Sequence, residues 1–340
     1  MALTTWLFEF MHDLKDPATR LDPTAVGAHI DFYLDLWQGA EARGFDGVMW
    51  SEHHFGAAYS PSPNLYISHV AARTQHLRLG VLGMVGPYCT PWRVVEEFAM
   101  LSHITHGRYE MGLVSGIPPE FIAAGLSIPE MAERHAEVCA VLDAARKGGR
   151  LTHHGAHWSF DDLEVQPPFR DPSAPVWTAT RSQGSARRAA ERGWKIATGF
   201  NSVANISTIT SAYREQAEAN GWEATPQHVG LRRMVTFTDR PEQQRDGVAK
   251  GKQALRTFLE ASAGPLPPFA AVLDRPDTDS DQLSNDEFIS GTGEQVAEQL
   301  RSQAEAIGSG HVMVMFSAMD PAQLRDAHDQ FASDVIPLLR

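Results

Sequence analysis

Three titratable residues, Glu52, His53 and His54, directly follow a short apolar segment of the chain. Residues 46–50 are bounded by turn residues and are typical of a strand that is buried on both faces. In parallel α/β folds, ligands bind at the carboxyl ends of such strands. Because histidine side chains titrate near neutrality, this position favours acid–base chemistry over a loop with two surface histidines.

The same three residues are a poor set of metal ligands. A catalytic metal is usually held by three histidine or carboxylate ligands, and consecutive residues of a short loop cannot all point at one ion. The chain contains no H-E-x-x-H motif, and a second histidine group, His153, His154 and His157, lies in a segment that we expect to be irregular. We therefore expect no metal site.

A second candidate site lies in the run T-A-T-R-S-Q-G-S-A-R-R, residues 178–188. Arg181, Ser182 and Ser185 would stand where a strand turns into a helix. Backbone N–H groups, hydroxyls and an arginine at a helix start can bind a phosphate, although an ordinary serine-capped helix is the alternative. The chain has neither G-x-x-x-x-G-K-[ST] nor G-x-G-x-x-G, so a nucleoside triphosphate site and a Rossmann dinucleotide site are not supported.

The elements that must position these residues are eight strands that alternate with eight helices. The expected strands are residues 6–10, 46–50, 77–84, 109–114, 174–180, 194–198, 229–237 and 311–316. This alternation predicts an α/β fold, a (β/α)₈ TIM barrel formed by one domain over residues 1–340, whose strand ends share one mouth. Residues 239–292 interrupt the alternation after the seventh strand with prolines and an acidic run, and we expect a lid insertion there.

Composition limits the classes of function. A chain of 340 residues that is 43% hydrophobic and 21% charged is typical of a globular protein, and its net charge of −13 argues against binding to nucleic acid. The two cysteines, Cys89 and Cys139, imply no disulfide framework, which fits a reducing cytoplasm. We expect no signal peptide, no membrane span and a cytoplasmic location.

Nearly the whole chain resembles the bacterial luciferase-like flavin-dependent monooxygenases, and the resemblance is most specific in four segments. They are G-F-D-G-V-M-W-S-E-H-H-F, L-R-L-G-V-L-G-M-V-G-P-Y-C-T-P-W-R-V-V-E-E, G-R-Y-E-M-G-L-V-S-G and the turn at residues 180–185. The resemblance implies a TIM barrel that binds reduced FMN at its carboxyl face. Oxygen adds to the flavin, and the resulting peroxyflavin oxidises an organic substrate.

The resemblance also implies roles for single residues. His53 matches the catalytic histidine of the E-H-H motif, with Glu52 beside it. Leu82 and Gly83 fall where relatives carry a non-prolyl cis peptide beneath the flavin ring. Ser182 matches a hydroxyl that binds the phosphate of FMN, and so does the serine three residues later.

The chain departs from luciferase at three positions. Luciferase has an arginine that contacts the phosphate where this chain has Ser115, and an acidic residue where it has Arg181. Positive charge is thus lost after the fourth strand and gained after the fifth, so we expect both residues at the cofactor site. Val114 replaces a cysteine near the flavin, so light emission is not expected.

These features predict a two-component FMN monooxygenase that receives reduced flavin from a separate flavin reductase. The expected substrate pocket, for a small or medium organic molecule, comprises His54, an apolar wall and Glu9 as a polar anchor; the wall residues are Trp50, Phe55, Tyr59, Tyr88 and Phe200. An oxidoreductase that uses the deazaflavin F420 and a non-catalytic flavin-binding protein are the alternatives. Family members pair through early helices, so we expect a homodimer through residues 65–73 and 91–106, with apolar surface from Val94, Val95, Phe98 and Leu101.

Overall fold

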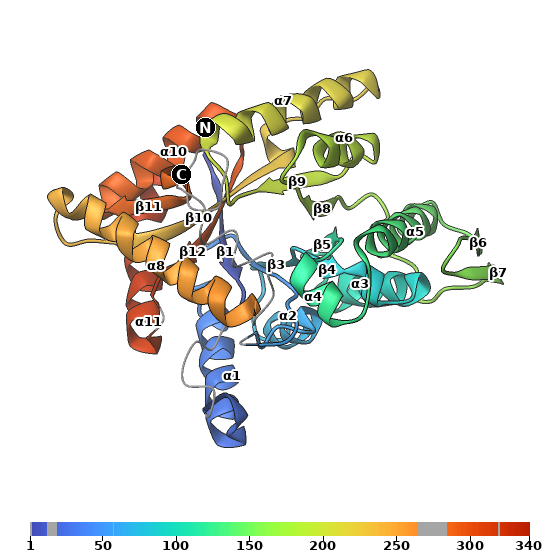
Figure 1. Ribbon diagram of the computed structural model, residues 1–340, viewed down its shortest axis with the longest axis horizontal. Helices are drawn as coiled ribbons and strands as arrows, with labels where there is room; N and C mark the ends of the chain where they lie inside the picture. Colours follow the sequence, from blue (N-terminus) through green and yellow to red (C-terminus); the bar gives the residue numbers. More distant parts are fainter. Residues whose placement is uncertain (1, 12–18, 57, 264–283, 319) are drawn as a thin grey trace.

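Eight parallel strands close into a barrel in the computed structural model, which describes residues 2–11, 19–56, 58–263, 284–318 and 320–340 (Figure 1). The barrel strands are β1 (Thr4–Glu9), β2 (Gly47–Trp50), β3 (Arg78–Val81), β5 (Tyr109–Val114), β8 (Val176–Ala179), β9 (Lys195–Thr198), β10 (Val229–Phe237) and β12 (His311–Phe316). The first strand pairs with β2 on one side and with β12 on the other, where Thr4 lies opposite His311, and this pairing closes the ring. The predicted (β/α)₈ barrel is confirmed.

Helices surround the strands. The described helices are α1 (Pro23–Gln38), α2 (Pro63–Ala71), α3 (Pro91–Ile104), α4 (Pro118–Ala123), α5 (Ile128–Arg146), α6 (Gln183–Glu191), α7 (Val203–Ala219), α8 (Gln244–Ala263), α10 (Gly293–Ile307), α11 (Pro321–Gln330) and α12 (Ile336–Leu339). The first of them begins earlier than residue 27, where the apolar spacing had placed its start. Its true start is set by Asp22, whose carboxylate accepts the N–H of Thr24 at 3.0 Å, and by Pro23 in the first turn.

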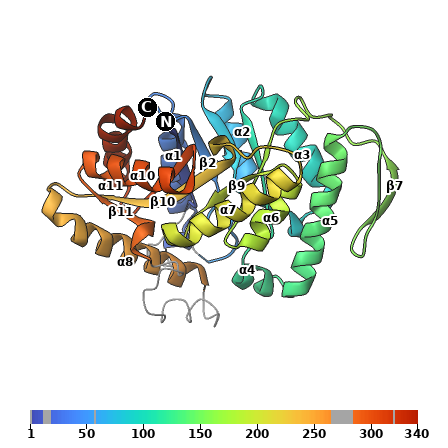
Figure 2. The same cartoon turned by 90° about the horizontal axis from the view of Figure 1, so that it is seen from above.

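Two smaller units interrupt the barrel pattern. A hairpin follows α5, in the segment that we expected to be irregular; its antiparallel strands are β6 (Leu151–His154) and β7 (Ser159–Leu163), and it projects beyond α5 (Figure 2). The second unit contains β11 (Phe288–Gly291), which pairs with the carboxyl half of β10 and was not predicted, because the prolines and acidic residues around it suggested irregular structure. The acidic run before it, up to residue 283, lies outside the described residues.

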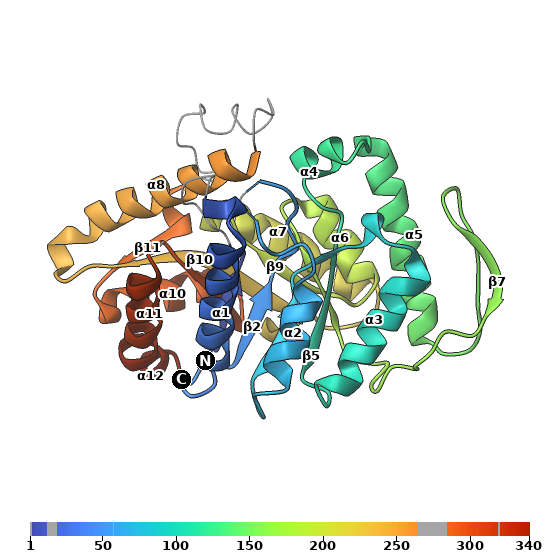
Figure 3. The ribbon, with the colours of Figure 1, turned by 90° about the horizontal axis from the view of Figure 1, so that it is seen from below.

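The carboxyl end of the barrel carries α8 and α4, whereas both chain termini lie at the opposite end (Figure 3). Gly251 of α8 packs against Phe288 of β11 and Thr236 of β10. Within the described ranges, we find no helix that is both long enough and apolar enough to cross a membrane.

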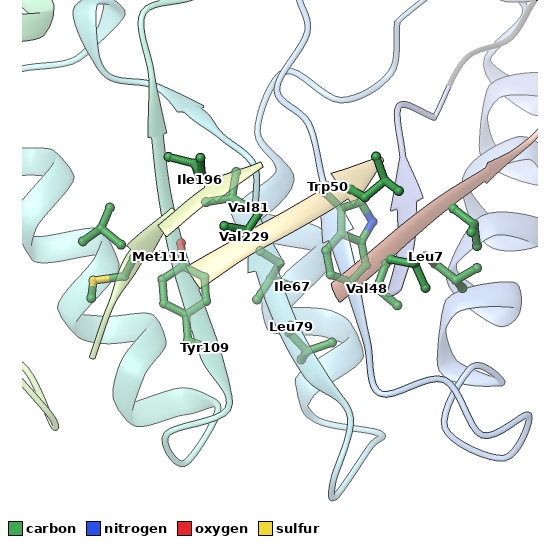
Figure 4. Packing of buried hydrophobic residues seen from close by; sticks show 14 of the residues in the cluster. Leu7, Val48, Trp50, Ile67, Leu79, Val81, Tyr109, Met111, Ile196 and Val229 are labelled. Carbon is green, nitrogen blue, oxygen red and sulfur yellow. The ribbon is translucent and has the colours of Figure 1, made fainter. Parts of the chain in front are cut away.

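Side chains alternate between two apolar layers along each strand. On β1, Leu7 belongs to the layer between the barrel and the helices, whereas Trp6 and Phe8 belong to the cluster inside the barrel. Figure 4 shows part of the outer layer, including Leu7, Val48 and Trp50. Full burial of each such side chain stabilises the fold by roughly 1.5–3 kcal/mol. Because the apolar residues are held in these two layers, the layers determine which residues of a strand face the inside of the barrel and can reach its mouth.

Candidate active site

His53 lies at the carboxyl end of the barrel, paired with a carboxylate from a distant segment. Its Nδ1 is 2.8 Å from Oε1 of Glu120 on α4, and the two side chains are only 11% and 3% exposed. A carboxylate at Nδ1 favours the tautomer with the proton on that nitrogen and makes Nε2 the basic nitrogen of the ring. The pair therefore has the geometry of an oriented acid–base histidine.

The backbone around His53 is also fixed. Its N–H donates to the carbonyl of Ser60 at 3.0 Å, and the Ser60 hydroxyl donates to the carbonyl of Ser51 at 2.7 Å. The ring of Phe10, the inward-facing residue just after β1, lies 4.9 Å from the His53 ring. The imidazole is thus in contact with both the Phe10 ring and the Glu120 carboxylate.

Glu52 is bonded to His54 rather than to His53. One carboxylate oxygen accepts the N–H of Val85 at 3.1 Å, and the other lies 2.9 Å from Nε2 of His54. Burial acts to lower the pKa of His54, but the hydrogen bond to Glu52 and the charges of Glu52 and Glu120 outweigh it and raise that pKa. Glu52 therefore contacts His54 and β4 (Met84–Val85), whereas the carboxylate paired with His53 is that of Glu120.

Tyr88 joins this group. Its ring meets the His54 ring edge-on at 5.0 Å, and its buried hydroxyl has no hydrogen-bond partner among the described residues. Burial and the charges of Glu120 and Glu52 raise the pKa of Tyr88, so its hydroxyl stays protonated and can donate to a ligand. Phe55 is 55% exposed and lies 5.8 Å from His54 at the rim.

Three predicted pocket residues lie elsewhere. The carboxylate of Glu9 lies on the helix side of β1, 3.9 Å from Nε2 of the fully buried His328 on α11. Trp50 packs against Trp37 of α1 at 5.2 Å, and the hydroxyl of Tyr59 donates to the carbonyl of Arg20. These three expectations are corrected. Glu9 and Trp50 face outward because successive residues of a strand face opposite sides, and Tyr59 packs against His29 of α1.

The predicted cofactor residues occupy the ends of three barrel strands. The peptide bond between Leu82 and Gly83, just after β3, is cis, as the resemblance implied. Ser115 is exposed at the end of β5. The structure thus places both features on the mouth side of the barrel.

The turn that we predict to bind a phosphate begins α6. Ser182 caps the helix by accepting the N–H of Ser185 at 3.2 Å, and the two hydroxyls lie 3.0 Å apart. Arg181, Ser182 and Gly184 are exposed. An arginine, two hydroxyls and the free N–H groups of a helix start form a donor set that fits a phosphate chemically.

The second histidine group has a structural role in the hairpin. His153 lies 3.0 Å from a carboxylate oxygen of Glu137, and His157 lies 3.1 Å from Glu133, so both tie the hairpin to α5. Among the described residues, no group of three or more histidine, cysteine, aspartate or glutamate side chains could hold a metal ion.

Comparisons with known proteins agree with this fold. The profile of the family described as "Luciferase-like monooxygenase" matches residues 12–310. The uncharacterized protein y4wF of Sinorhizobium fredii is 31% identical over 300 residues, which is 86% of each chain. The oxygenase component of a flavin-dependent trigonelline monooxygenase from Acinetobacter baylyi is 29% identical over 171 residues, 49% of this chain and 47% of that one.

Solved structures give the same result for the fold. The monooxygenase RslO1 of Streptomyces bottropensis superposes with a TM-score of 0.81 at 21% identity, covering 98% of this chain and 99% of that chain. Matching relatives include a Baeyer–Villiger monooxygenase in complex with FMN as well as F420-dependent dehydrogenases. Such relatives therefore use either FMN or F420.

Proposed function

The chain belongs to the luciferase-like monooxygenase family, whose members are flavin- or F420-dependent oxidoreductases, and from this premise we propose that it is an FMN-dependent monooxygenase. In this proposal it oxygenates a small or medium organic molecule with reduced FMN and O₂. The observation that carries the proposal is the buried pair of His53 and Glu120 at the same end of the barrel as the Leu82–Gly83 cis peptide.

FMN would be held at two places on the mouth. Arg181, Ser182 and Ser185 would supply the donors for its phosphate, with Ser115 at the neighbouring strand end, and the cis peptide between Leu82 and Gly83 would contact its ring, as the family resemblance implies. When bound, FMN supplies the electrons that activate O₂. The chain itself has only to place the substrate, exclude water and control protons.

In this proposal, His53 transfers protons to and from the substrate. Glu120 holds the proton on Nδ1, so Nε2 can accept a proton from the reacting substrate or return one, an effect worth about 10²–10⁴ in rate. Tyr88 can donate a hydrogen bond from the neighbouring side, since its hydroxyl stays protonated. Both groups are buried, which strengthens such interactions relative to water.

A separate reductase would supply the reduced flavin. Relatives are described as the oxygenase component of a monooxygenase and as the oxygenating constituent of another. By analogy, this chain would work as the oxygenase of a two-component system in the cytoplasm.

An F420-dependent oxidoreductase is the second candidate. A glucose-6-phosphate dehydrogenase of this kind from Kineococcus radiotolerans is 25% identical over 93% of this chain. Such an enzyme would transfer hydride without consuming O₂, so the two candidates differ in both cofactor and oxygen demand.

Binding and oxygen uptake separate the candidates. The purified chain is titrated anaerobically with reduced FMN and with reduced F420, and oxygen uptake is then followed with a flavin reductase and candidate substrates. We expect reduced FMN to bind at least about tenfold tighter, the equivalent of about 1.4 kcal/mol, and substrate to stimulate O₂ consumption. Tighter binding of F420, with product formed in the absence of oxygen, would favour the dehydrogenase. Binding of FMN without oxygen uptake for any substrate would favour a non-catalytic flavin-binding protein.

A further inference from the structure

Arg232 of β10 places a guanidinium group inside the barrel. The residue is 4% exposed, and its Cζ lies 3.6 Å from the centroid of the Phe200 ring and 5.9 Å from that of Phe8. Gly199 makes room for it, since a Cβ atom there would lie 2.8 Å from Nε of the arginine. Phe200 follows β9 and is itself partly exposed, so the guanidinium lies just beneath the rim of the mouth.

The hydrogen bonds of Arg232 are incomplete. Its Nη2 pairs with Glu287, but Nε and Nη1 have no partner in the part of the chain that the structure describes. The same carboxylate also accepts from Nη1 of Arg233 at 3.2 Å and from the N–H of Phe200 at 2.7 Å. Glu287 therefore already accepts three hydrogen bonds, and none of them comes from the two remaining nitrogens of Arg232.

The charges of this group do not balance. Arg232, Arg233 and Glu287 are 4%, 0% and 0% exposed, and two guanidiniums share the one carboxylate. Among the described residues a further carboxylate, that of Asp286, acts on Arg233 and offsets part of the lowering of its pKa by burial, but Asp286 is partly exposed and accepts the N–H of Val203 at 2.8 Å. Burial, together with the charges of Arg233 and Arg181, lowers the pKa of Arg232.

A similar group at the other end of the barrel shows what is unusual here. Arg78 and Lys195 also share one buried carboxylate, that of Glu110, but the Arg78 side chain is 47% exposed. Water can therefore complete its hydrogen bonds. Arg232 has no such access, and a buried donor left unpaired costs about 1–3 kcal/mol, more when it is charged. An anion would remove that cost.

We propose that Arg232 binds the acid group of an organic-acid substrate, a carboxylate or sulfonate, through its Nε and Nη1 donors, with the apolar remainder of the substrate directed along Phe8 and Phe10 toward His53. Phe8 and Phe10 link the two ends of this path: their rings are 5.1 Å apart, and Phe10 meets His53 at 4.9 Å. The proposal deepens the proposed function, on which it rests, by naming a substrate class for the same mouth. The predicted phosphate site at residues 180–185 uses other donors, of which Arg181 and Ser182 are exposed.

Matched pairs of acids and neutral analogues test this assignment. Benzoate, phenylacetate, hexanoate and octanesulfonate, each with its amide or sulfonamide, are titrated calorimetrically into the wild type without flavin. We expect at least one acid to bind ten- to a hundredfold tighter than its neutral analogue, as one or two charge-assisted hydrogen bonds would give. Arg232→Gln should abolish this preference, Arg232→Lys should keep part of it, and Arg78→Gln, the control arginine, should leave it unchanged.

Several outcomes would overturn the proposal. They are no preference for any acid in the wild type, or an undiminished preference in Arg232→Gln. A third is a loss of FMN affinity in Arg232→Gln with acid binding intact, which would mean that the anion belongs to the flavin. If Arg232→Gln does not fold, as judged by circular dichroism, the comparison rests on Arg232→Lys, whose acid preference must fall below that of the wild type.

The test is independent of the proposed function. Acid binding that depends on Arg232 without FMN-dependent oxygen uptake would keep this site and reject the monooxygenase. Oxygen uptake that only neutral substrates stimulate, and that is unchanged in Arg232→Lys, would keep the monooxygenase and reject the acid-binding site.

Discussion

The properties of single side chains depend most on partners that are distant in sequence. His53 is oriented by Glu120, 67 positions further along the chain, and Glu52 is engaged by His54. Glu120 is a positioning residue, because it acts through the imidazole. Removing it should therefore have a different effect from removing His53.

We expect His53→Ala to reduce kcat by about 10²–10⁴, with reduced-FMN affinity within a few-fold of wild type. Glu120→Gln should reduce kcat by about 10–100-fold and change the pH dependence of turnover, with Glu120→Asp partly restoring both. His157→Ala is the control and should leave turnover intact. Steady-state kinetics across pH measure these effects. Near-normal turnover in His53→Ala would reject the assignment.

Arg181→Ala should weaken FMN binding by about ten- to a hundredfold and leave riboflavin binding nearly unchanged. The reason is that a charge-assisted hydrogen bond to the phosphate is worth roughly 1.5–3 kcal/mol, and riboflavin has no phosphate. Titrations of both reduced flavins into both proteins provide the measurement. Because the charge of Arg181 is felt at Arg232, the competing outcome is a change in substrate affinity alone, and equal losses for both flavins would also contradict the phosphate role.

Glu9→Gln should make the protein more stable at alkaline pH. Burial raises the pKa of Glu9 to about 8 from an ordinary 4.5, so the folded state holds a proton that the unfolded state has lost. Stability from this group therefore falls as pH rises from about 4.5 to 8. Burial lowers the pKa of His328 to about 3, so this residue has the opposite effect on stability. Its contribution to stability rises with pH, but only between about pH 3 and its usual pKa of 6.5.

Thermal unfolding at pH 5 and pH 8.5 tests this difference. The gain in Tm from Glu9→Gln should be clearly larger at pH 8.5 than at pH 5. An equal Tm change at both pH values would mean that the carboxyl group is ionised in the folded state throughout.

At the scale of single elements, the helix α3 buries one apolar face and exposes another. On α3, the residues predicted to supply a dimer surface, Val94, Val95, Phe98 and Leu101, are at most 3% exposed and pack against the barrel. Met100 and Ile104 of the same helix are 49% and 41% exposed. The apolar spacing predicts the helix correctly, but the prediction that these four residues supply the dimer surface is wrong, because apolar residues occur on both faces of the helix and these four lie on the buried one.

Close packing inside the barrel limits the size of the side chain that a strand position can hold. A Cβ atom on Gly47 of β2 would lie 2.3 Å from the Trp6 ring inside the barrel. Gly47→Ala should therefore lower the free energy of unfolding by about 1–3 kcal/mol or more through overpacking. Gly27→Ala in α1 is the matched control: it meets no atom within 4 Å, and it should be neutral or stabilising by up to about 1 kcal/mol. Urea unfolding measures both. Equal stability of the two variants would contradict the packing described here.

At the scale of the whole molecule, α2 and α3 together expose four large apolar side chains. These are Leu65, Trp92, Met100 and Ile104. Exposed apolar side chains that gather on one surface usually mark an interaction site, and we expect this one to form a homodimer.

Charged residues at this surface should separate the subunits. Met100→Lys combined with Ile104→Lys places two charges one helical turn apart, and it should raise the dimer dissociation constant at least about a hundredfold, the equivalent of about 2.7 kcal/mol. Ile128→Lys, at an apolar residue that is 61% exposed on α5, is the control. Analytical ultracentrifugation provides the measurement. A monomeric wild type at micromolar concentration would reject the dimer.

The sequence alone determined the eight-stranded barrel, the position of His53 and the turn that begins α6. These features depend on local order: apolar segments of strand length, a titratable group directly after a strand, and a serine at a helix start. The cis peptide after Leu82 also followed, through the family resemblance.

Only the tertiary structure decided which side chains meet. Glu120 reaches His53, and Glu287 reaches Arg232 across 55 positions, through folding of the whole barrel. It also decided that Glu9 faces the helices. Barrel strands are covered on both faces, so polarity does not alternate along them, and the direction of one side chain becomes known only when its neighbours are in place.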